Sequence, residues 1–290
     1  MTARTVAGPG GRALQVAVSG PQDGIPLVTH HGTPGAAVPY AAVVEATRRR
    51  GLRHVIYSRP GYAGSDRDEG RSIAACAADV AAILDDLGAE RCYTFGESGG
   101  GPHALACAAL LGDRVIKAAS IAGIAPWGAE GLDWLSGMGD ENQAEFTAIQ
   151  EGPDALRAFL EQARVSLNGL TGEHVAASLG DLIGSADRAA LTGAYAEHIA
   201  TVIRTAVAGG IEGWFDDDMA FVGPWGFELD AISVPVTVWQ GDDDRMVPFA
   251  HGEWLAAHVP GARAELRRGE GHLSISEAAR DEILDDLLAG

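Results

Sequence analysis

Residues 92–105 of the chain read Cys-Tyr-Thr-Phe-Gly-Glu-Ser-Gly-Gly-Gly-Pro-His-Ala-Leu, with Ser98 at their centre. A β-favouring apolar run over 92–95 comes directly before the serine, and helix-forming residues follow it closely. Glycines at 96 and 100, two positions to either side of Ser98, leave room for a sharp strand–turn–helix junction that presents the hydroxyl above a sheet. Ser98 is therefore a candidate nucleophile, and the alternative is an ordinary helix-capping serine.

Short β-rich runs and Ala-rich helical stretches alternate on both sides of this segment. The expected strands cover residues 2–7, 14–19, 26–30, 54–58, 92–95, 115–121, 234–240 and 264–267. The expected core helices cover residues 38–50, 73–87, 99–111, 249–258 and 274–288. Such alternation predicts an α/β fold, with a mostly parallel, doubly wound sheet between two layers of helices. Ser274 and Glu277 predict a capping box at the start of the last helix.

The alternation of strands and helices stops between residues 126 and 230, where helical patterns occur with no convincing strand between them. The clearest of these helical patterns cover 155–167 and 186–207. A block of this length is too long to be a simple connection between strands. We therefore expect two core segments, 1–125 and 231–290, and a helical cap over 126–230 that is inserted after the sixth strand and lies over the carboxyl ends of the strands.

A serine hydroxyl needs a base to remove its proton, and that base needs a carboxylate to orient it. His272 lies on a glycine-rich loop between the last strand and the last helix, where it could reach the serine from above. Asp242, Asp243 and Asp244 follow the strand at 234–240, and their positions alone do not choose between them. A metal site built from the three is unfavourable, because neighbouring side chains diverge.

Acyl transfer also needs backbone N–H groups that bind the developing oxyanion. Gly99, the residue after the candidate nucleophile, is expected to supply one of them. The loop after the early strand reads His30-His31-Gly32-Thr33-Pro34-Gly35. Pro34 has no N–H, so Thr33 is the second candidate. A metal shared by His30 and His31 is not expected, because adjacent side chains on a strand point to opposite faces.

Taken together, these segments resemble the α/β-hydrolase superfamily, in its cap-bearing branch of esterases, haloperoxidase-like enzymes and proline iminopeptidases. The resemblance rests on the elbow around Ser98 and on the segments 31–35, 59–65, 241–248 and 271–272. It implies that the triad acid lies four residues before Pro248, which selects Asp244. By the same resemblance, haloalkane dehalogenases and epoxide hydrolases are expected to have an aspartate as the nucleophile at this place. The serine therefore argues against both groups.

The overall composition excludes several other classes of function. The chain has a net charge of −19, which disfavours binding to nucleic acid or to anionic lipid. Arg48, Arg49 and Arg50 are read as cations at a helix C-terminus rather than as an anion site. There is no apolar stretch long enough to span a membrane and no signal-peptide pattern near the N-terminus. The sequence predicts a cytoplasmic protein.

The three cysteines, Cys76, Cys92 and Cys107, are widely spaced and lie in apolar surroundings. They are expected to be buried thiols in a reducing compartment, since their spacing resembles neither a zinc site nor a disulfide framework.

Two features of the insertion are open to structural or functional interpretations. Aromatic residues gather near its two ends, and they either pack the cap against the core or form the wall of a substrate pocket. The tryptophans of this group are Trp127, Trp134, Trp214 and Trp225. The acidic run Asp216-Asp217-Asp218 is expected to be a solvated turn, and the alternative is recognition of a substrate amine.

The expected function is hydrolysis of a small to medium carboxylic ester through an acyl-enzyme, with a small molecule as substrate and no cofactor or metal. Cleavage of a peptide, as in proline iminopeptidases, or of a lactone or carbon–carbon bond would use the same triad. A cofactor-free lyase or peroxidase-like activity is a further alternative. A non-catalytic ligand-binding relative is the alternative outside enzymes. The sequence leaves the oligomeric state open.

Overall fold

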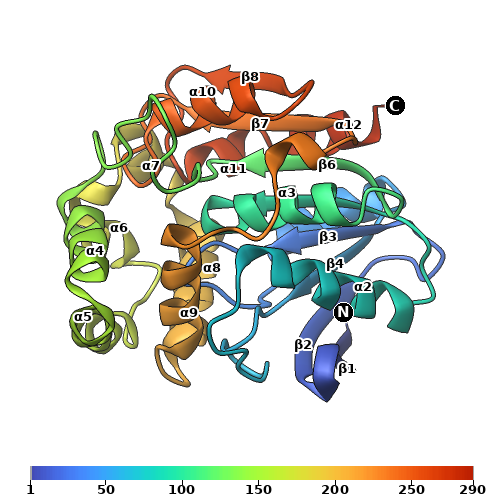
Figure 1. Ribbon diagram of the computed structural model, residues 1–290, viewed down its shortest axis with the longest axis horizontal. Helices are drawn as coiled ribbons and strands as arrows, with labels where there is room; N and C mark the ends of the chain where they lie inside the picture. Colours follow the sequence, from blue (N-terminus) through green and yellow to red (C-terminus); the bar gives the residue numbers. More distant parts are fainter. Residues whose placement is uncertain (1, 290) are drawn as a thin grey trace.

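The computed structural model describes residues 2–289, and its centre is one eight-stranded sheet (Figure 1). The strand order is β1-β2-β4-β3-β5-β6-β7-β8. β2 pairs antiparallel with β1 and β4, and the remaining neighbours pair in parallel. The strands are β1 Thr2–Ala7, β2 Ala13–Ser19, β3 Pro26–His30, β4 Arg53–Tyr57, β5 Cys92–Glu97, β6 Val115–Ile121, β7 Val236–Gly241 and β8 Arg263–Arg267. The prediction of a mostly parallel sheet is confirmed.

Helices cover both faces of the sheet, because successive residues of its inner strands point to opposite sides. Val238 belongs to the larger buried apolar cluster with α2, α3 and α10, whereas the adjacent Trp239 belongs to a second cluster with α1 and α12. The helices of the core are α1 Ala41–Arg49, α2 Cys76–Asp86, α3 Gly101–Leu110, α10 Phe249–His258, α11 Ser274–Ala278 and α12 Arg280–Leu288. The doubly wound arrangement is confirmed.

Six α-helices lie between β6 and β7, which confirms a helical insertion after the sixth strand. They are α4 Asp140–Glu151, α5 Pro153–Leu167, α6 Val175–Ser178, α7 Ser185–Ala190, α8 Gly193–Val207 and α9 Glu212–Val222. Figure 1 shows them grouped at one end of the sheet, with α8 and α9 nearer to it than α4 and α5. We call this insertion the cap. Its boundaries at residues 126 and 230 stay a prediction.

The structure corrects two predicted helices. The stretch 186–207 is divided into α7 and α8 near Gly193, which adopts a left-handed φ of 51°. The last stretch is divided into α11 and α12, and the predicted capping box is wrong. The Ser274 hydroxyl donates to Glu270, at 2.6 Å, instead of capping its own helix.

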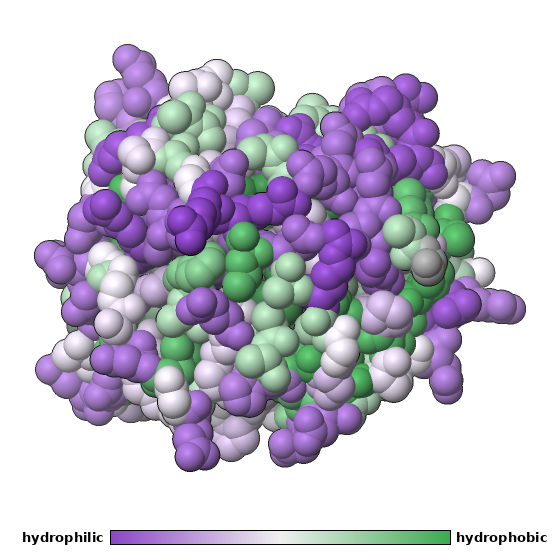
Figure 2. Space-filling view, turned by 90° about the horizontal axis from the view of Figure 1, so that it is seen from above, coloured by the Kyte–Doolittle hydropathy of each residue, from purple (hydrophilic) through white to green (hydrophobic). Residues whose placement is uncertain are grey.

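The surface is a mixture of hydrophilic and hydrophobic side chains. Hydrophilic side chains cover most of the face shown in Figure 2, and hydrophobic groups lie between them. Cys76, Cys92 and Cys107 are buried as predicted. Within residues 2–289, none of the helices has both the length and the apolar character needed to cross a membrane.

A buried carboxylate of the cap holds the loop that leads into α11. Asp187 on α7 has no exposed surface, and its oxygens accept the backbone N–H groups of His272, Leu273 and Ser274 at 3.1, 2.8 and 2.8 Å. These N–H groups begin a helix, where a negative charge is favourable. The capping function that the sequence assigned to Ser274 therefore belongs to a residue 87 positions away.

Replacing Asp187 with asparagine keeps the shape of the side chain but removes the charged acceptor. Hydrogen bonds to a charged group contribute about 1.5–3 kcal/mol, so we expect Asp187→Asn to lower the free energy of unfolding by about 2 kcal/mol. Urea denaturation measures this loss. Asp154→Asn on the exposed surface of α5 is the matched control. Equal stability of the two variants would show that Asp187 does not anchor the loop.

Candidate functional site

A cavity of about 270 Å³ lies between the cap and the sheet. Its lining combines residues of the loops that follow β3, β5, β7 and β8 with side chains of the cap helices. Thr33, Ser98, Gly99 and His272 all line it. The cavity thus lies where the carboxyl ends of parallel strands meet, which is where open α/β sheets bind ligands.

The elbow between β5 and α3 forces Ser98 into an unusual backbone conformation. Its φ of 53° lies in the left-handed region, which costs a non-glycine residue about 1–3 kcal/mol. A Cβ added to Gly96 would lie 1.9 Å from the carbonyl oxygen of Gly100, and one added to Gly100 would lie 2.2 Å from that of His30. Only glycine fits at both positions, so the tight packing of the elbow explains the spacing seen in the sequence.

His272 and Asp244 form a close pair beside this elbow. Asp244 Oδ2 lies 2.8 Å from His272 Nδ1, and both side chains are almost completely buried. The same carboxylate accepts hydrogen bonds from the Gln240 amide and from the N–H groups of Met246 and Val247. Ser98 and His272 line the same cavity. Within residues 2–289, no hydrogen bond joins their side chains.

The two neighbours of Asp244 have structural contacts. Asp242 accepts the N–H of Gly269 at 2.7 Å, and so joins the two loops that carry Asp244 and His272. Asp243 accepts the N–H of Ala186 at 3.1 Å, at the start of α7. Of the three adjacent acids, the structure places only Asp244 against the imidazole.

The environment of His272 favours its protonated form. Burial by itself lowers the pKa of His272, but the charge and hydrogen bond of Asp244 oppose that effect, and the charges of Asp187 and Glu97 add to them. The net result is a pKa of His272 above its ordinary value. An imidazole of this kind is well suited to accept and hold a proton.

Thr33 and Gly99, the two predicted oxyanion donors, are adjacent in space. A Cβ added to Gly99 would lie 2.5 Å from Thr33 Oγ1. Among the described residues, the N–H of Thr33 has no hydrogen-bond partner, and Thr33 lines the cavity. The N–H of Gly99 lies in the turn directly after Ser98.

The two histidines before this loop are buried and structural. His31 Nε2 accepts the N–H of Arg59 at 3.1 Å, which leaves Nδ1–H to donate to Gly32 O at 2.7 Å. Burial, with the nearby charge of Arg59, lowers the pKa of His30 to about 3. Residues 2–289 contain no group of three or more His, Cys, Asp or Glu side chains arranged to hold a metal ion.

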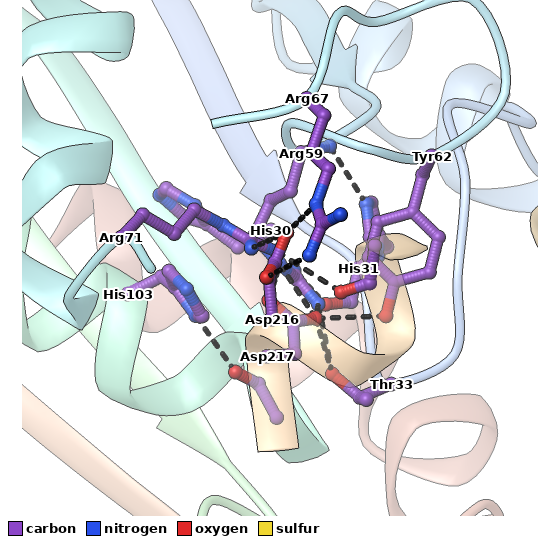
Figure 3. A network of polar contacts seen from close by, with 12 residues as sticks. His30, His31, Thr33, Arg59, Tyr62, Arg67, Arg71, His103, Asp216 and Asp217 are labelled. Atoms are coloured by element: carbon purple, nitrogen blue, oxygen red, sulfur yellow. Dashed lines mark hydrogen bonds and ion pairs between the residues drawn. The ribbon is translucent and has the colours of Figure 1, made fainter. Parts of the chain in front are cut away.

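The predicted solvated turn at residues 216–218 is wrong. Asp216, Asp217 and Asp218 are 2%, 0% and 2% exposed and belong to α9. Figure 3 shows Asp216 and Asp217 among arginine side chains of the core. A signal was present in the sequence, because apolar residues flank the run on both sides and no glycine or proline interrupts it. The arginine partners, however, are far away in the sequence.

The four candidate pocket tryptophans divide into two groups. Trp214 lines the cavity, and its indole donates to Glu145 Oε1 at 2.7 Å. The other three are absent from the described lining. Trp127 and Trp134 pack against each other with ring centroids 4.8 Å apart, and Trp225 stacks on Phe227. Their role is packing, as the first interpretation held.

Comparison with known proteins agrees with the fold of the chain. The family model described as "alpha/beta hydrolase fold" matches residues 25–279. The non-heme chloroperoxidase of Streptomyces lividans is 30% identical over 273 residues, which cover 93% of this chain and 92% of the relative. A 2-hydroxy-6-oxononadienedioate/2-hydroxy-6-oxononatrienedioate hydrolase of Cupriavidus pinatubonensis is 26% identical, covering 88% of this chain and 82% of the relative.

Among solved structures, a hydrolase from Pseudomonas aeruginosa has a TM-score of 0.72 at 19% identity, covering 100% of this chain and 99% of the other. These matches extend over both halves of the sheet and the cap between them. The relatives are named for different reactions, so their shared property is the fold and not one substrate. On the coverage of the family match, the chain belongs to the alpha/beta hydrolase fold family.

Proposed function

We propose that the protein hydrolyses carboxylic esters by two-step acyl transfer at Ser98. The proposal is carried by one observation: the elbow of Ser98 and the His272–Asp244 pair meet at a single cavity. Ser98 attacks the carbonyl carbon while His272 accepts its proton and Asp244 holds the imidazole. The N–H groups of Thr33 and Gly99 bind the oxyanion. Water then cleaves the acyl-enzyme with His272 as base.

The lining of the cavity favours a neutral, small to medium ester. Apolar side chains from the cap form much of it, and the lining residues include no lysine or arginine. The four acidic lining residues are Glu97, Glu141, Glu145 and Asp218. The Cupriavidus relative is named for a dioate, and the carboxylates of such a compound would find no lysine or arginine in this lining. Lactones and compounds with a cleavable carbon–carbon bond remain alternative substrates for the same triad.

Hydrolysis of p-nitrophenyl esters from acetate to decanoate tests the proposal. We expect wild-type activity with an optimum at one acyl length, and a loss of about 10³-fold or more in Ser98→Ala, because the nucleophile is removed. Circular dichroism of both proteins controls for folding. A folded wild type that is inert on every ester contradicts the ester assignment.

Labelling with a fluorophosphonate then separates the alternatives. Labelling of Ser98 in an ester-inactive protein would direct attention to peptides, lactones, carbon–carbon bonds and peroxidase-like reactions on the same site. No labelling would favour a non-catalytic ligand-binding protein.

The pH dependence of ester hydrolysis tests the role of His272. Protonated His272 cannot accept the proton of Ser98, so kcat/KM should fall as the pH is lowered through the pKa of His272. Since that pKa is raised, we expect the midpoint of the fall above pH 6.5. Asp187→Asn removes one of the charges that raise it, and should move the midpoint to lower pH. An unchanged midpoint in this variant, with Asp154→Asn as control, would contradict the assignment.

A specific observation favours substrates with an amine as a second candidate, as in an aminopeptidase. Glu145 on α4 and Asp218 on α9 both line the cavity from the cap side, and Asp218 Oδ2 has no hydrogen-bond partner among the described residues. Burial raises the pKa of Glu145 to about 7, and burial with the charge of Glu145 raises the pKa of Asp218 well above its ordinary value. The raised pKa values mean that the pair holds a proton in the empty cavity, and an ammonium group that enters would favour its release and pair with the resulting carboxylate.

Alanine p-nitroanilide and its N-acetylated form distinguish this candidate. If the acid pair binds the amine, the wild type should prefer the free amine, and Asp218→Asn or Glu145→Gln should lower that preference by about tenfold or more, because a recognition bond is lost. Glu151→Gln at the exposed end of α4 is the matched control. Equal rates on the two anilides in the wild type would rule out amine recognition.

A further inference from the structure

The network in Figure 3 joins the cap to the loop that carries Thr33. Asp217 on α9 is completely buried, and its Oδ2 accepts hydrogen bonds from Arg59 Nη2 at 2.6 Å, Thr33 Oγ1 at 2.8 Å and the Tyr62 hydroxyl at 2.9 Å. Its Oδ1 accepts Arg71 Nη2 at 2.6 Å. Burial alone would raise the pKa of Asp217, but Arg59 and Arg71 outweigh it and keep the carboxylate ionised.

Arg59 extends this contact to the backbone of the loop. Its Nη2 donates to Gly32 O and to Thr33 Oγ1, both at 2.9 Å, and its Nη1 donates to His31 O. The guanidinium is planar and rigid, so a carboxylate that fixes one edge of it also fixes the other donors. Asp217 therefore determines where Arg59 holds the loop.

The planarity of the peptide bond carries this restraint to the N–H of Thr33. Gly32 O is held by Arg59 Nη2 and by His31 Nδ1. The carbonyl of Gly32 and the N–H of Thr33 belong to one planar trans peptide and point in opposite directions. Fixing the carbonyl therefore fixes the direction of the N–H. A Cβ added to Gly32 would lie 3.4 Å from the Cβ of Ser98, so this peptide lies directly beside the nucleophile.

We propose that Asp217 is a positioning residue for the oxyanion site: through Arg59 and the Thr33 hydroxyl, it sets the direction of the Thr33 N–H. Helix α9 of the cap is then part of the catalytic assembly as well as a cover for the substrate. The proposal rests on the function proposed above, and goes beyond it by assigning a catalytic contribution to a cap residue that does not line the cavity.

The neighbouring Asp216 provides a matched control. It is equally buried and pairs with Arg67 at 2.7 and 2.9 Å and with Arg71 at 3.6 Å. Its described contacts do not include the loop over 31–33. Replacing either aspartate with asparagine removes a buried ion pair between the cap and the core, but only Asp217→Asn disturbs the loop.

The test measures the rate at which a fluorophosphonate labels Ser98, because this reagent also places an oxygen in the oxyanion site. We expect Asp217→Asn to be labelled about 10²-fold more slowly than wild type, the effect of a displaced catalytic group. Asp216→Asn should be labelled at close to the wild-type rate. On p-nitrophenyl esters, Asp217→Asn should lower kcat with little change in KM, since the oxyanion forms only in the transition state.

A second pair of variants covers the case in which Asp217→Asn does not fold. Thr33→Val keeps the shape of the side chain and the Arg59–Asp217 ion pair but loses the hydroxyl, and it should be labelled slowly. Thr33→Ser keeps the hydroxyl and should restore fast labelling.

The outcomes that overturn the inference are distinct from those that overturn the function. Equal labelling of Asp217→Asn and Asp216→Asn, or wild-type labelling of Thr33→Val, overturns the positioning role and leaves the proposed function intact. A folded wild type that is not labelled at all overturns both.

Discussion

The steric constraint at the β5–α3 elbow determines the arrangement of the site. A Cβ at residue 96 would lie 1.9 Å from a carbonyl oxygen, and one at residue 100 would lie 2.2 Å from another. The chain can therefore make this turn only with glycine at both positions. That turn holds Ser98 at a positive φ and brings it against the loop of Thr33. The strain at one residue is stable because the sheet and helix on either side are tightly packed.

The cap is attached to the core through buried carboxylates rather than through apolar contact alone. Asp187 holds the loop of His272, and Asp217 holds the loop of Thr33 through Arg59. Removing the Asp217 carboxylate would leave the buried charges of Arg59 and Arg71 without this partner, which costs about 3–5 kcal/mol. A cap fixed at these two places cannot leave the core as a rigid unit without releasing both loops. Its aspartates therefore link cap docking to the geometry of the site.

The charges around the cavity are distributed unequally. Behind the loop, Arg59, Arg67 and Arg71 are paired with three acids, so their positive charge is neutralised away from the substrate. The acids are Asp216, Asp217 and Glu212. The cavity itself is lined by acids and by no lysine or arginine. Together with a net charge of −19, this arrangement disfavours anions relative to neutral and cationic molecules.

The sequence by itself determined the strand order along the chain, the helical insertion and the turn at Ser98, because strand and helix periodicities and glycine spacing are local properties. It also predicted His272, from its glycine-rich loop after the last strand, whereas the choice of Asp244 among three adjacent acids came from the resemblance to the α/β-hydrolase superfamily. It could not show that Asp187 would take the capping role assigned to Ser274, or that the run at 216–218 would be buried. Those outcomes depend on partners many residues distant, Arg59 among them, which only the tertiary structure brings together. From the sequence alone, a carboxylate in a helix is predicted to be solvated, because the cation that would pair with it in the interior is not known.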